Sequence, residues 1–371
     1  MADGTSIEWT DATWNPITGC SVVSPGCTNC YAMKLAGTRL KRHSSRAGLT
    51  RNTKAGPVWT GAVRFNERWL DQPLRWTKPR MIFVCAHGDL FAESVPDEWI
   101  DRVFAVMALA SQHTFQVLTK RPERMRRYLS GFDLNNRISE ALGRMLDGDW
   151  IWREGKQFRG PIEHLIGVFF GEDTDDAGDI VYHHDPMPMA NVWLGVSVED
   201  QLRAIERRAP MAELHNRGWL TWVSYEPALG PVDWDGWEFI RWLVSGGESD
   251  TDGRSARVSQ ADWHRHARDF CAANGIAFNF KQWGCLIDID QIAGRIAAST
   301  DAGTAWIQRD GTVWRPQAPL NFADAEWLAG FLGHKHEHHS DGRTYLRIKK
   351  GAAGRLLDGV EHNGFLARVL P

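Results

Sequence analysis

Six short runs of apolar and β-branched residues recur along the chain, and polar residues stand at or just beyond most of their ends. Continuous apolar runs of this length are typical of strands that are buried on both faces, as in a parallel sheet. Amphipathic helical patterns over 96–112, 200–215 and 260–273 lie between several of these runs. Strands that alternate with helices predict βα units and an α/β fold, and six or more such strands suit a barrel or partial barrel. The predicted strands are MIFVC (81–85), TFQVLT (114–119), NVWLGVS (191–197), WLTWVS (219–224), FIRWLVS (239–245) and IAFNFK (276–281).

Two stretches depart from this alternation. Residues 131–190 contain the acidic GEDTDDAGD and the Pro-rich HHDPMPM, so we expect an insertion there that could act as a lid. Residues 286–371 have the pattern of an appended α+β segment. We therefore predict a partial barrel over 1–285, with the insertion at 131–190, and a C-terminal extension over 286–371. Between 219 and 245 two strands leave little room for a helix, so the βα repeat is imperfect.

The composition favours a globular protein outside the membrane. Of 371 residues, 43% are hydrophobic and 24% charged, a balance that excludes a disordered chain. No apolar run approaches the ~20 residues of a membrane span, and the first 20 residues contain no apolar signal-peptide core. We expect a cytoplasmic protein with no membrane partner. The net charge of −3 gives no strongly basic footprint over the whole chain. The 19 Trp are expected mostly in the core, with a few lining a site for a planar ligand.

Three of the six cysteines lie within eleven residues, as Cys20-x6-Cys27-x2-Cys30 on a loop rich in Gly and Pro. Without a secretory signal, this spacing favours a metal site or cluster over a disulfide framework. An iron–sulfur cluster with three protein thiolates leaves one iron open to a substrate or cofactor. A structural zinc usually takes four ligands, and His43 could be the fourth. We favour an iron–sulfur cluster as the interpretation of the three cysteines. A zinc site and purely structural thiols are the alternatives.

Polar residues gather at the ends of all six predicted strands. In parallel α/β folds the active site forms at the carboxyl ends of the strands. Lys120 and Arg121 could bind a carboxylate or phosphate, and Glu199 and Glu226 could bind hydroxyl or amino groups. The strand ends read Cys85-Ala86-His87-Gly88-Asp89, Thr119-Lys120-Arg121, Ser197-Val198-Glu199, Ser224-Tyr225-Glu226, Ser245-Gly246-Gly247-Glu248-Ser249 and Lys281-Gln282-Trp283.

A set of sequence blocks resembles the phage-associated three-Cys-motif protein family, which in turn resembles the radical S-adenosylmethionine (SAM) superfamily. The resemblance covers most of the chain except roughly 131–190 and 286–340. It implies a partial βα barrel whose N-terminal three-Cys loop holds a [4Fe-4S] cluster. The cluster would cleave SAM to methionine and a 5′-deoxyadenosyl radical that abstracts hydrogen from a substrate. The blocks are IEWTDATWNPITGC, PGCTNCYA, GDLF, LTKRPERM, NVWLGVSVEDQ, SYEPALGP, VSGGES, FNFKQWG and KKGAAGRLLDG.

The chain departs from the superfamily pattern at two points. The usual loop is C-x3-C-x2-C with an aromatic residue just before the last Cys, whereas here the first gap is six and Tyr31 follows Cys30. The usual Gly-Gly-Glu after the second strand is also absent. His87-Gly88-Asp89 is the candidate for holding the SAM amino group, and Gly246-Gly247-Glu248 could serve adenine or substrate.

The resemblance implies the following roles. Cys20, Cys27 and Cys30 would ligate the cluster. The catalytic candidates are Lys281 and Cys85. Cys85 could donate a hydrogen atom to a substrate radical, or it could be a small buried hydrophobic residue. Cys271 is expected in the core. Gln282 and Trp283 would lie toward the substrate. The predicted SAM-binding residues are Tyr31, His87, Asp89, Lys120, Arg121, Ser197, Glu199, Glu226, Gly246, Gly247 and Glu248.

The expected partners are SAM and an electron donor of the flavodoxin or ferredoxin type. The phage association suggests DNA or a nucleotide as substrate, with isomerase, lyase and other modifications all open. Basic residues over 120–127 and 343–355 could follow a nucleic-acid backbone or be solvated faces. The His-rich run over 334–339 could bind metal or be an exposed loop. The rival functions are a zinc-containing barrel hydrolase and a nucleic-acid-binding protein with a structural zinc.

Overall fold

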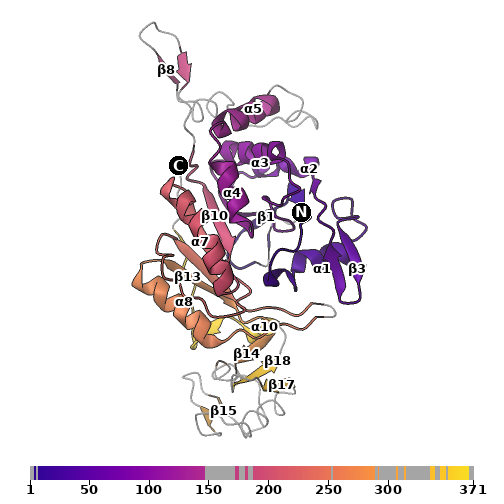
Figure 1. Cartoon of the computed structure of the whole chain (residues 1–371), viewed down its shortest axis with the longest axis vertical. Coiled ribbons are helices and arrows are strands. Elements are labelled where there is room, and N and C mark those ends of the chain that lie inside the picture. Colours follow the sequence, from indigo (N-terminus) through magenta and orange to yellow (C-terminus); the bar gives the residue numbers. More distant parts are fainter. Residues whose placement is uncertain are drawn as a thin grey trace.

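The computed structural model describes residues 4–5, 7–146, 172–174, 180–182, 187–251, 254–288, 291, 306–307, 313–314, 335–338, 343–347 and 350–366. Its centre is a seven-stranded sheet in the order β1-β6-β7-β10-β11-β12-β13, and all its strand pairs are parallel (Figure 1). Among the described residues the edge strands β1 and β13 do not pair with each other, so the curled sheet is a partial barrel. The strands are β1 (Ala12–Trp14), β6 (Met81–Val84), β7 (Thr114–Thr119), β10 (Val192–Ser197), β11 (Leu220–Tyr225), β12 (Trp242–Gly246) and β13 (Ala277–Gln282).

Helices connect most successive strands, and this confirms the predicted α/β partial barrel. The three predicted helices and six predicted strands are all present, with ends shifted by up to about three residues. Between β11 and β12, residues 226–241 form no helix, as expected. The helices are α1 (Tyr31–Gly37), α2 (Glu67–Leu70), α3 (Asp97–Leu109), α4 (Pro122–Leu129), α5 (Leu134–Leu146), α7 (Gln201–Asn216), α8 (Ala261–Ala273) and α10 (Lys350–Ala353), with 3-10 turns at Pro25–Cys27 and Gln72–Arg75.

The two faces of the sheet bury different side chains, because successive residues of a strand point to opposite sides. Ile82, Leu194 and Val223 face outward and pack in the main core with the helices. The inner face is filled by indole rings, and those of Trp222 and Trp242 are 4.9 Å apart. A Cβ at Gly195 would lie 2.2 Å from Cε2 of Trp222, so only glycine leaves room for that ring. The tryptophans of this face are core residues, as expected for most of the 19.

Polarity on the inner face rises toward the carboxyl ends of the strands. Beyond the Trp layer, Ser197, Ser224, Val244 and Asn279 are in register across β10–β13. One step further, the same alternation places Glu199, Glu226 and Lys281 at the edge of the sheet. Tryptophan side chains therefore fill the inside of the barrel, and charged side chains lie at the carboxyl ends of its strands. A functional site is expected at this carboxyl edge.

A small lobe follows β1. Its own core contains Met33, Leu49 and Trp59, with Cys20 and Cys30 packed against it. In this lobe α1 packs on the hairpin of β3 (Thr50–Thr53) and β4 (Gly56–Trp59). A second ribbon pairs β2 (Ile17–Thr18) with β5 (Arg64–Phe65). The lobe is thus packed directly against two of the three loop cysteines.

The C-terminal segment packs along the edge strand β13. The Phe280 amide donates to the His362 carbonyl over 2.9 Å, and the Gly364 amide to the Phe278 carbonyl over 2.8 Å. These bonds cover an edge that would otherwise expose unpaired backbone groups. The segment's strands are β14 (Leu286–Asp288), β15 (Trp306–Ile307), β16 (Val313–Trp314), β17 (Lys335–His338), β18 (Thr344–Arg347), β19 (Leu356–Leu357) and β20 (Val360–Glu361). The domain boundary at 285 stays a prediction.

The predicted insertion begins with α5, which packs on α3. Beyond it only the hairpin of β8 (Glu172–Thr174) and β9 (Ile180–Tyr182) is described before residue 187. The predicted lid therefore lies mostly outside the described residues, as do the histidine side chains of the run 334–339. Within the described part of the chain, no helix is long and apolar enough to cross a membrane.

Candidate functional site

The three-cysteine loop lies between β2 and α1, beside the turn that follows β6. Pro25 opens a 3-10 turn that ends at Cys27, and Cys30 is the N-cap of α1. The loop is fixed to the sheet by a parallel bridge between Gly19 and Gly88. The sequence folds this way because Pro suits the first position of such a turn and a cap residue stands outside the helix. The loop therefore lies at the carboxyl edge of the first strands.

The three thiols are free and close enough to interact electrostatically. Cys27 is buried, and Cys20 and Cys30 are half-buried. Burial raises the pKa of the Cys20 thiol well above its usual range, and Asp89 and the other two thiols raise it further. Burial also raises the pKa of Cys30. Among the described residues, no group of three or more His, Cys, Asp or Glu side chains is arranged to hold a single metal ion. His43, the expected fourth zinc ligand, bonds Ser45 Oγ through Nδ1 over 2.6 Å.

Arg121 and Asp89 brace the start of the loop. The guanidinium Nη1 donates to Oδ2 of Asp89 over 2.9 Å and to the Cys20 sulfur over 3.5 Å, while Nη2 donates to the Ser21 carbonyl over 3.2 Å. Asp89 also accepts from Thr119 Oγ1 over 2.7 Å. Both side chains of the ion pair are buried. Asp89 and Arg121 thus satisfy each other's charge and hold Cys20.

Glu199 joins the middle of the loop to the sheet. Its carboxylate accepts from Ser24 Oγ over 2.6 Å, from Arg207 Nη1 over 2.9 Å, and from Lys120 Nζ. Burial would raise the pKa of this carboxyl, but Lys120 and Arg207 outweigh it and lower the pKa to about 2. A Cβ on Gly26 would lie 2.5 Å from Oε1 of Glu199, so the loop can approach this closely only with glycine there.

Glu248 and its partner hold the loop from the other side. Arg257 donates from Nε to Oε2 of Glu248 over 2.8 Å and from Nη2 to the Pro25 carbonyl over 3.0 Å. Two neighbouring contacts strengthen this link: Thr251 Oγ1 donates to Asn29 Oδ1 over 2.9 Å, and Asn29 Nδ2 donates to the Ser255 carbonyl over 3.1 Å. The segment after β12 therefore runs along the cysteine loop.

A second polar group stands at the ends of β11 and β13. Lys281 Nζ donates to both oxygens of Glu226, over 2.7 and 2.9 Å, and Gln282 Nε2 donates to Oε1 of Glu226 over 3.1 Å. The buried Oε1 of Gln282 has no hydrogen-bond partner among the described residues. Gly246 lies beside Glu226, with the added Cβ 3.5 Å from its Cγ. This group combines an acceptor, a cation and an amide.

Tyr31 and His87 lie beside each other next to the loop. The Tyr31 hydroxyl donates to the Ala86 carbonyl over 2.5 Å, and the two rings are 6.0 Å apart. His87 Nδ1 lies 2.7 Å from Nη2 of Arg46. Burial and the nearby Arg46 lower the pKa of His87 to about 4. Tyr31 remains 46% exposed, so its ring is available to a ligand.

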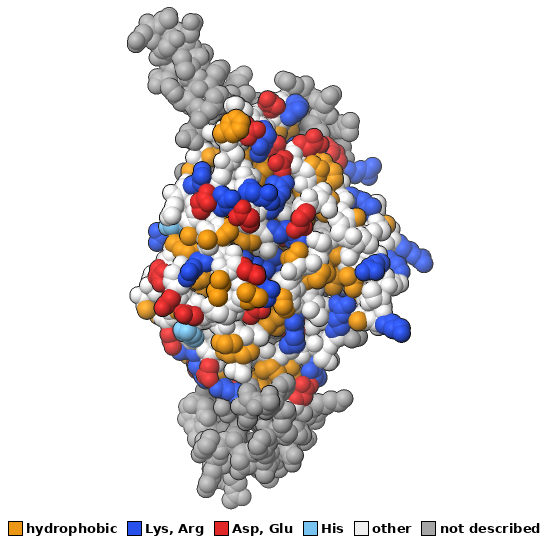
Figure 2. Space-filling view, in the orientation of Figure 1, with side chains coloured by type: hydrophobic (Ala, Val, Ile, Leu, Met, Phe, Trp, Pro, Cys, Tyr) orange, Lys and Arg blue, Asp and Glu red, His pale blue; other side chains and the backbone are white. Residues whose placement is uncertain are grey.

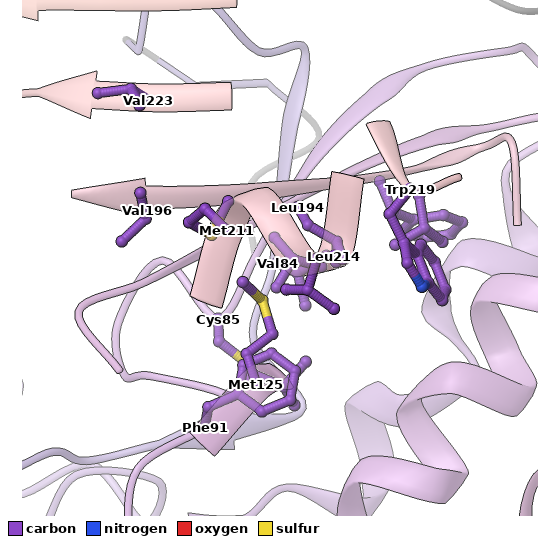
Figure 3. Close-up of a cluster of buried hydrophobic side chains, with 14 of the residues drawn as sticks. Val84, Cys85, Phe91, Met125, Leu194, Val196, Met211, Leu214, Trp219 and Val223 are labelled. Carbon is purple, nitrogen blue, oxygen red and sulfur yellow. The ribbon is translucent and has the colours of Figure 1, made fainter. Parts of the chain in front are cut away.

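Four predicted site residues have internal packing contacts instead of an open surface. Cys85 is buried among Phe91, Met125 and their neighbours (Figure 3), and burial raises its pKa to about 12. Its φ of 54° turns the chain at the end of β6, so the side chain joins the outer core. Trp283 is buried and donates from Nε1 to the Leu356 carbonyl over 2.8 Å. A Cβ on Gly247 would lie 2.0 Å from the Trp283 carbonyl oxygen. Ser197 is buried, and its carbonyl accepts from Arg207. Their proposed roles toward SAM or substrate stay predictions.

Sequence reasoning did not identify the arginines that neutralise these carboxylates. Arg207 lies eight residues after Glu199 on α7, and Arg257 lies nine residues after Glu248. The only signal for Arg207 is its place on the buried face of an amphipathic helix, with Ala204 and Met211. The structure thus adds Arg207 and Arg257 to the candidate site.

His264 is a further buried polar residue that sequence reasoning missed. Nδ1 lies 2.7 Å from Ser245 Oγ, and Nε2 lies 2.8 Å from Ser259 Oγ. The arrangement resembles a serine–histidine pair, but both Ser245 and His264 are inaccessible to solvent. Burial lowers the pKa of His264 to about 3. We therefore assign it a structural role.

This assignment predicts a pH-dependent contribution to stability. The pKa of His264 is lower in the folded protein than the ~6.5 of an unfolded chain, so protons favour unfolding between these values. Between pH 7 and pH 5, His264 should reduce the free energy of unfolding by about 2 kcal/mol. Denaturant unfolding at both pH values should show a smaller loss in His264→Gln than in the natural protein. Equal losses in the two proteins would contradict the assignment.

The structure defines a class: an α/β partial barrel with three free cysteines on a loop at the carboxyl edge of its parallel sheet. The chain belongs to the family described as "Protein of unknown function (DUF5131)", which matches residues 4–366. No curated protein matches the chain significantly. Among solved structures, a spore photoproduct lyase mutant with bound AdoMet and dinucleoside spore photoproduct is similar. Its TM-score is 0.35 and its sequence identity 9%, over 94% of this chain and 71% of that one.

Proposed function

We propose that this protein is a radical SAM enzyme in which Cys20, Cys27 and Cys30 ligate a [4Fe-4S] cluster. The observation that carries the proposal is the place of the three thiols. They share one short loop after the first strand of a parallel partial barrel, at the edge where α/β folds bind their ligands. The sequence resemblance to the radical SAM superfamily supports the same function.

The chemistry of the thiols fits such a cluster. Each cysteine of a [4Fe-4S] cluster binds a different iron, so three thiolates need not surround one ion. Burial favours the neutral thiols of Cys20 and Cys30 while no cation is present. A cationic centre would bind them as thiolates and release protons. Arg121 supplies an N–H donor to the Cys20 sulfur, and such donors are one determinant of cluster reduction potentials.

The paired charges and the Glu226 group have different roles in this proposal. Asp89, Arg121 and Glu199 are satisfied by protein partners, so we assign them to holding the loop. Glu226, Lys281 and Gln282 offer acceptors and donors at the mouth of the barrel, and we assign them to contacts with SAM. When bound and reduced, the cluster would supply the electron that cleaves SAM to methionine and a 5′-deoxyadenosyl radical, which takes a hydrogen atom from the substrate.

An electron donor of the flavodoxin or ferredoxin type and a phage-linked nucleotide or DNA substrate belong to the same proposal. So does Tyr31 as a neighbour of the bound cofactor. Isomerisation, lyase chemistry and other modifications begin from the same radical. The proposed function is therefore the step that these reactions share, the formation of the 5′-deoxyadenosyl radical.

The test uses full-length protein that is purified and reconstituted without oxygen. We expect about four irons and four sulfides per chain, and formation of 5′-deoxyadenosine after addition of dithionite and SAM. Iron, acid-labile sulfide and zinc are measured on the same sample. One zinc, no sulfide and no cleavage of SAM would overturn the proposal and favour the zinc-containing alternatives.

A further inference from the structure

The lobe next to the cysteine loop has a marked excess of positive charge. Residues 12–66 contain eight Lys and Arg and no Asp or Glu, although the whole protein carries a net charge of −3. The lobe contains α1, the β3–β4 hairpin and the turns between them. A cationic stretch of this length in an acidic protein points to an anionic partner.

Five of these cations are exposed and form what we call the basic lobe surface: Arg39, Lys41, Arg42, Arg51 and Lys54. None of the five has an ion-pair partner among the described residues. Arg51 and Lys54 lie on the β3–β4 hairpin, and the other three lie in the turns after α1. Figure 2 shows Lys and Arg side chains projecting from the right-hand edge, over α1 and β3, without acidic side chains between them.

Two other basic segments differ, because carboxylates pair with several of their described arginines. On α4, Arg124 pairs with Asp97, and Arg126 with Glu123 and Glu213. In the C-terminal segment, Arg343 pairs with Asp262 and Asp288, and Arg347 with Asp250 and Glu337. The two stripes that the sequence suggested for a nucleic-acid backbone are therefore mostly paired, and the basic lobe surface is the better candidate.

The basic lobe surface is firmly connected to the candidate site. Met33 Sδ accepts from the Trp59 amide over 3.3 Å, which ties α1 to β4. A Cβ on Gly37 would lie 2.1 Å from Cβ of Pro57, so the helix and hairpin pack in close contact. Since α1 begins directly after Cys30, a partner held on this surface would lie beside the cysteine loop.

We propose that the basic lobe surface binds the phosphate backbone of a nucleic acid. Exposed polar side chains stand near these cations, among them Thr38, Ser44 and Asn52. Hydroxyl and amide groups of this kind can hydrogen-bond to phosphates, as Arg and Lys can. Protein interfaces, in contrast, have apolar, aromatic centres and are depleted of Lys. A phosphate backbone therefore fits this surface better than an acidic protein. The inference names a partner for the proposed radical SAM site, but the binding itself requires no cluster.

Binding is measured by fluorescence anisotropy with full-length protein and labelled probes of about 30 nucleotides, over a series of salt concentrations. Duplex DNA, single-stranded DNA and single-stranded RNA of one sequence distinguish the source of the phosphates. We expect affinity to fall steeply with salt. The double variant R51E/K54E should bind at least about tenfold more weakly at about 100 mM salt, and its slope against log salt should decrease by about two.

The matched control is R144E/R217E, which changes net charge equally at exposed arginines of α5 and the α7 end. It should retain the natural salt slope. A second variant, R39E/K41E/R42E, tests the other half of the surface if the hairpin variant unfolds. Equal loss in the control, no change in either lobe variant, or binding of an acidic flavodoxin but no nucleic acid would overturn the inference. Nucleic-acid binding without SAM cleavage would instead overturn only the proposed function.

Discussion

Replacement of Cys27 by alanine is expected to abolish both cluster assembly and SAM cleavage. Cys27 is the buried member of the three thiols and lies at the end of the 3-10 turn. Removal of one of three protein ligands leaves two irons without a thiolate, so iron should fall from about four per chain to below one. Formation of 5′-deoxyadenosine should fall to the level without protein. Cys20→Ala and Cys30→Ala should give the same result.

The matched control is Cys271→Ala, which also removes a buried thiol. Cys271 lies on α8, and burial alone raises its pKa to about 12. Its loss leaves a small cavity in the core but touches no loop residue. Iron, sulfide and the visible absorption of the reconstituted protein should equal those of the natural chain. A Cys27→Ala protein with full iron and sulfide would exclude Cys27 as a ligand.

The sheet was predictable from the sequence because its central strands are buried on both faces. Such strands appear as uninterrupted apolar runs, and β6, β7 and β10 begin within one residue of their predicted starts. The first strand, β1, was missed, since three residues are too short to form a run. Helix α1 was missed because its seven residues are fewer than the roughly 11 over which helical periodicity can be recognised.

The site was only partly predictable, for a geometric reason. The rule that parallel strands end at one edge predicts that Glu199, Glu226 and Lys281 lie at that edge, and the structure places them there. It does not say which face a residue beyond the strand takes. Cys85 turns into the outer core at a φ of 54°, and Trp283 is buried against His264 with 5.2 Å between the rings. Neither position could be assigned without the backbone.

The second large effect is expected from Glu199→Gln, because this buried carboxylate pairs with two cations of the site. Its side chain is fully buried between Lys120 and Arg207, and the Arg207 side chain is only 6% exposed. The neutral amide would leave the Arg207 guanidinium without its counter-ion in a medium that solvates charge poorly. Removal of one partner from a buried pair typically costs about 3–5 kcal/mol. Denaturant unfolding of the protein without cluster should show a loss of this size.

Two further variants separate this effect from a general loss of packing. Glu248→Gln also removes a buried carboxylate, but its partner Arg257 is 36% exposed and can turn to water, so a much smaller loss is expected. The double variant Glu199→Gln/Arg207→Gln should cost less than the two single substitutions added together, because it leaves no unpaired guanidinium. Strict additivity would show that the pair is not coupled. Ser24 and Gly26 of the cysteine loop contact the same carboxylate. Glu199→Gln should therefore also reduce iron incorporation more than Glu248→Gln does. That result would identify Glu199 as the residue that holds the cysteine loop in a ligating conformation.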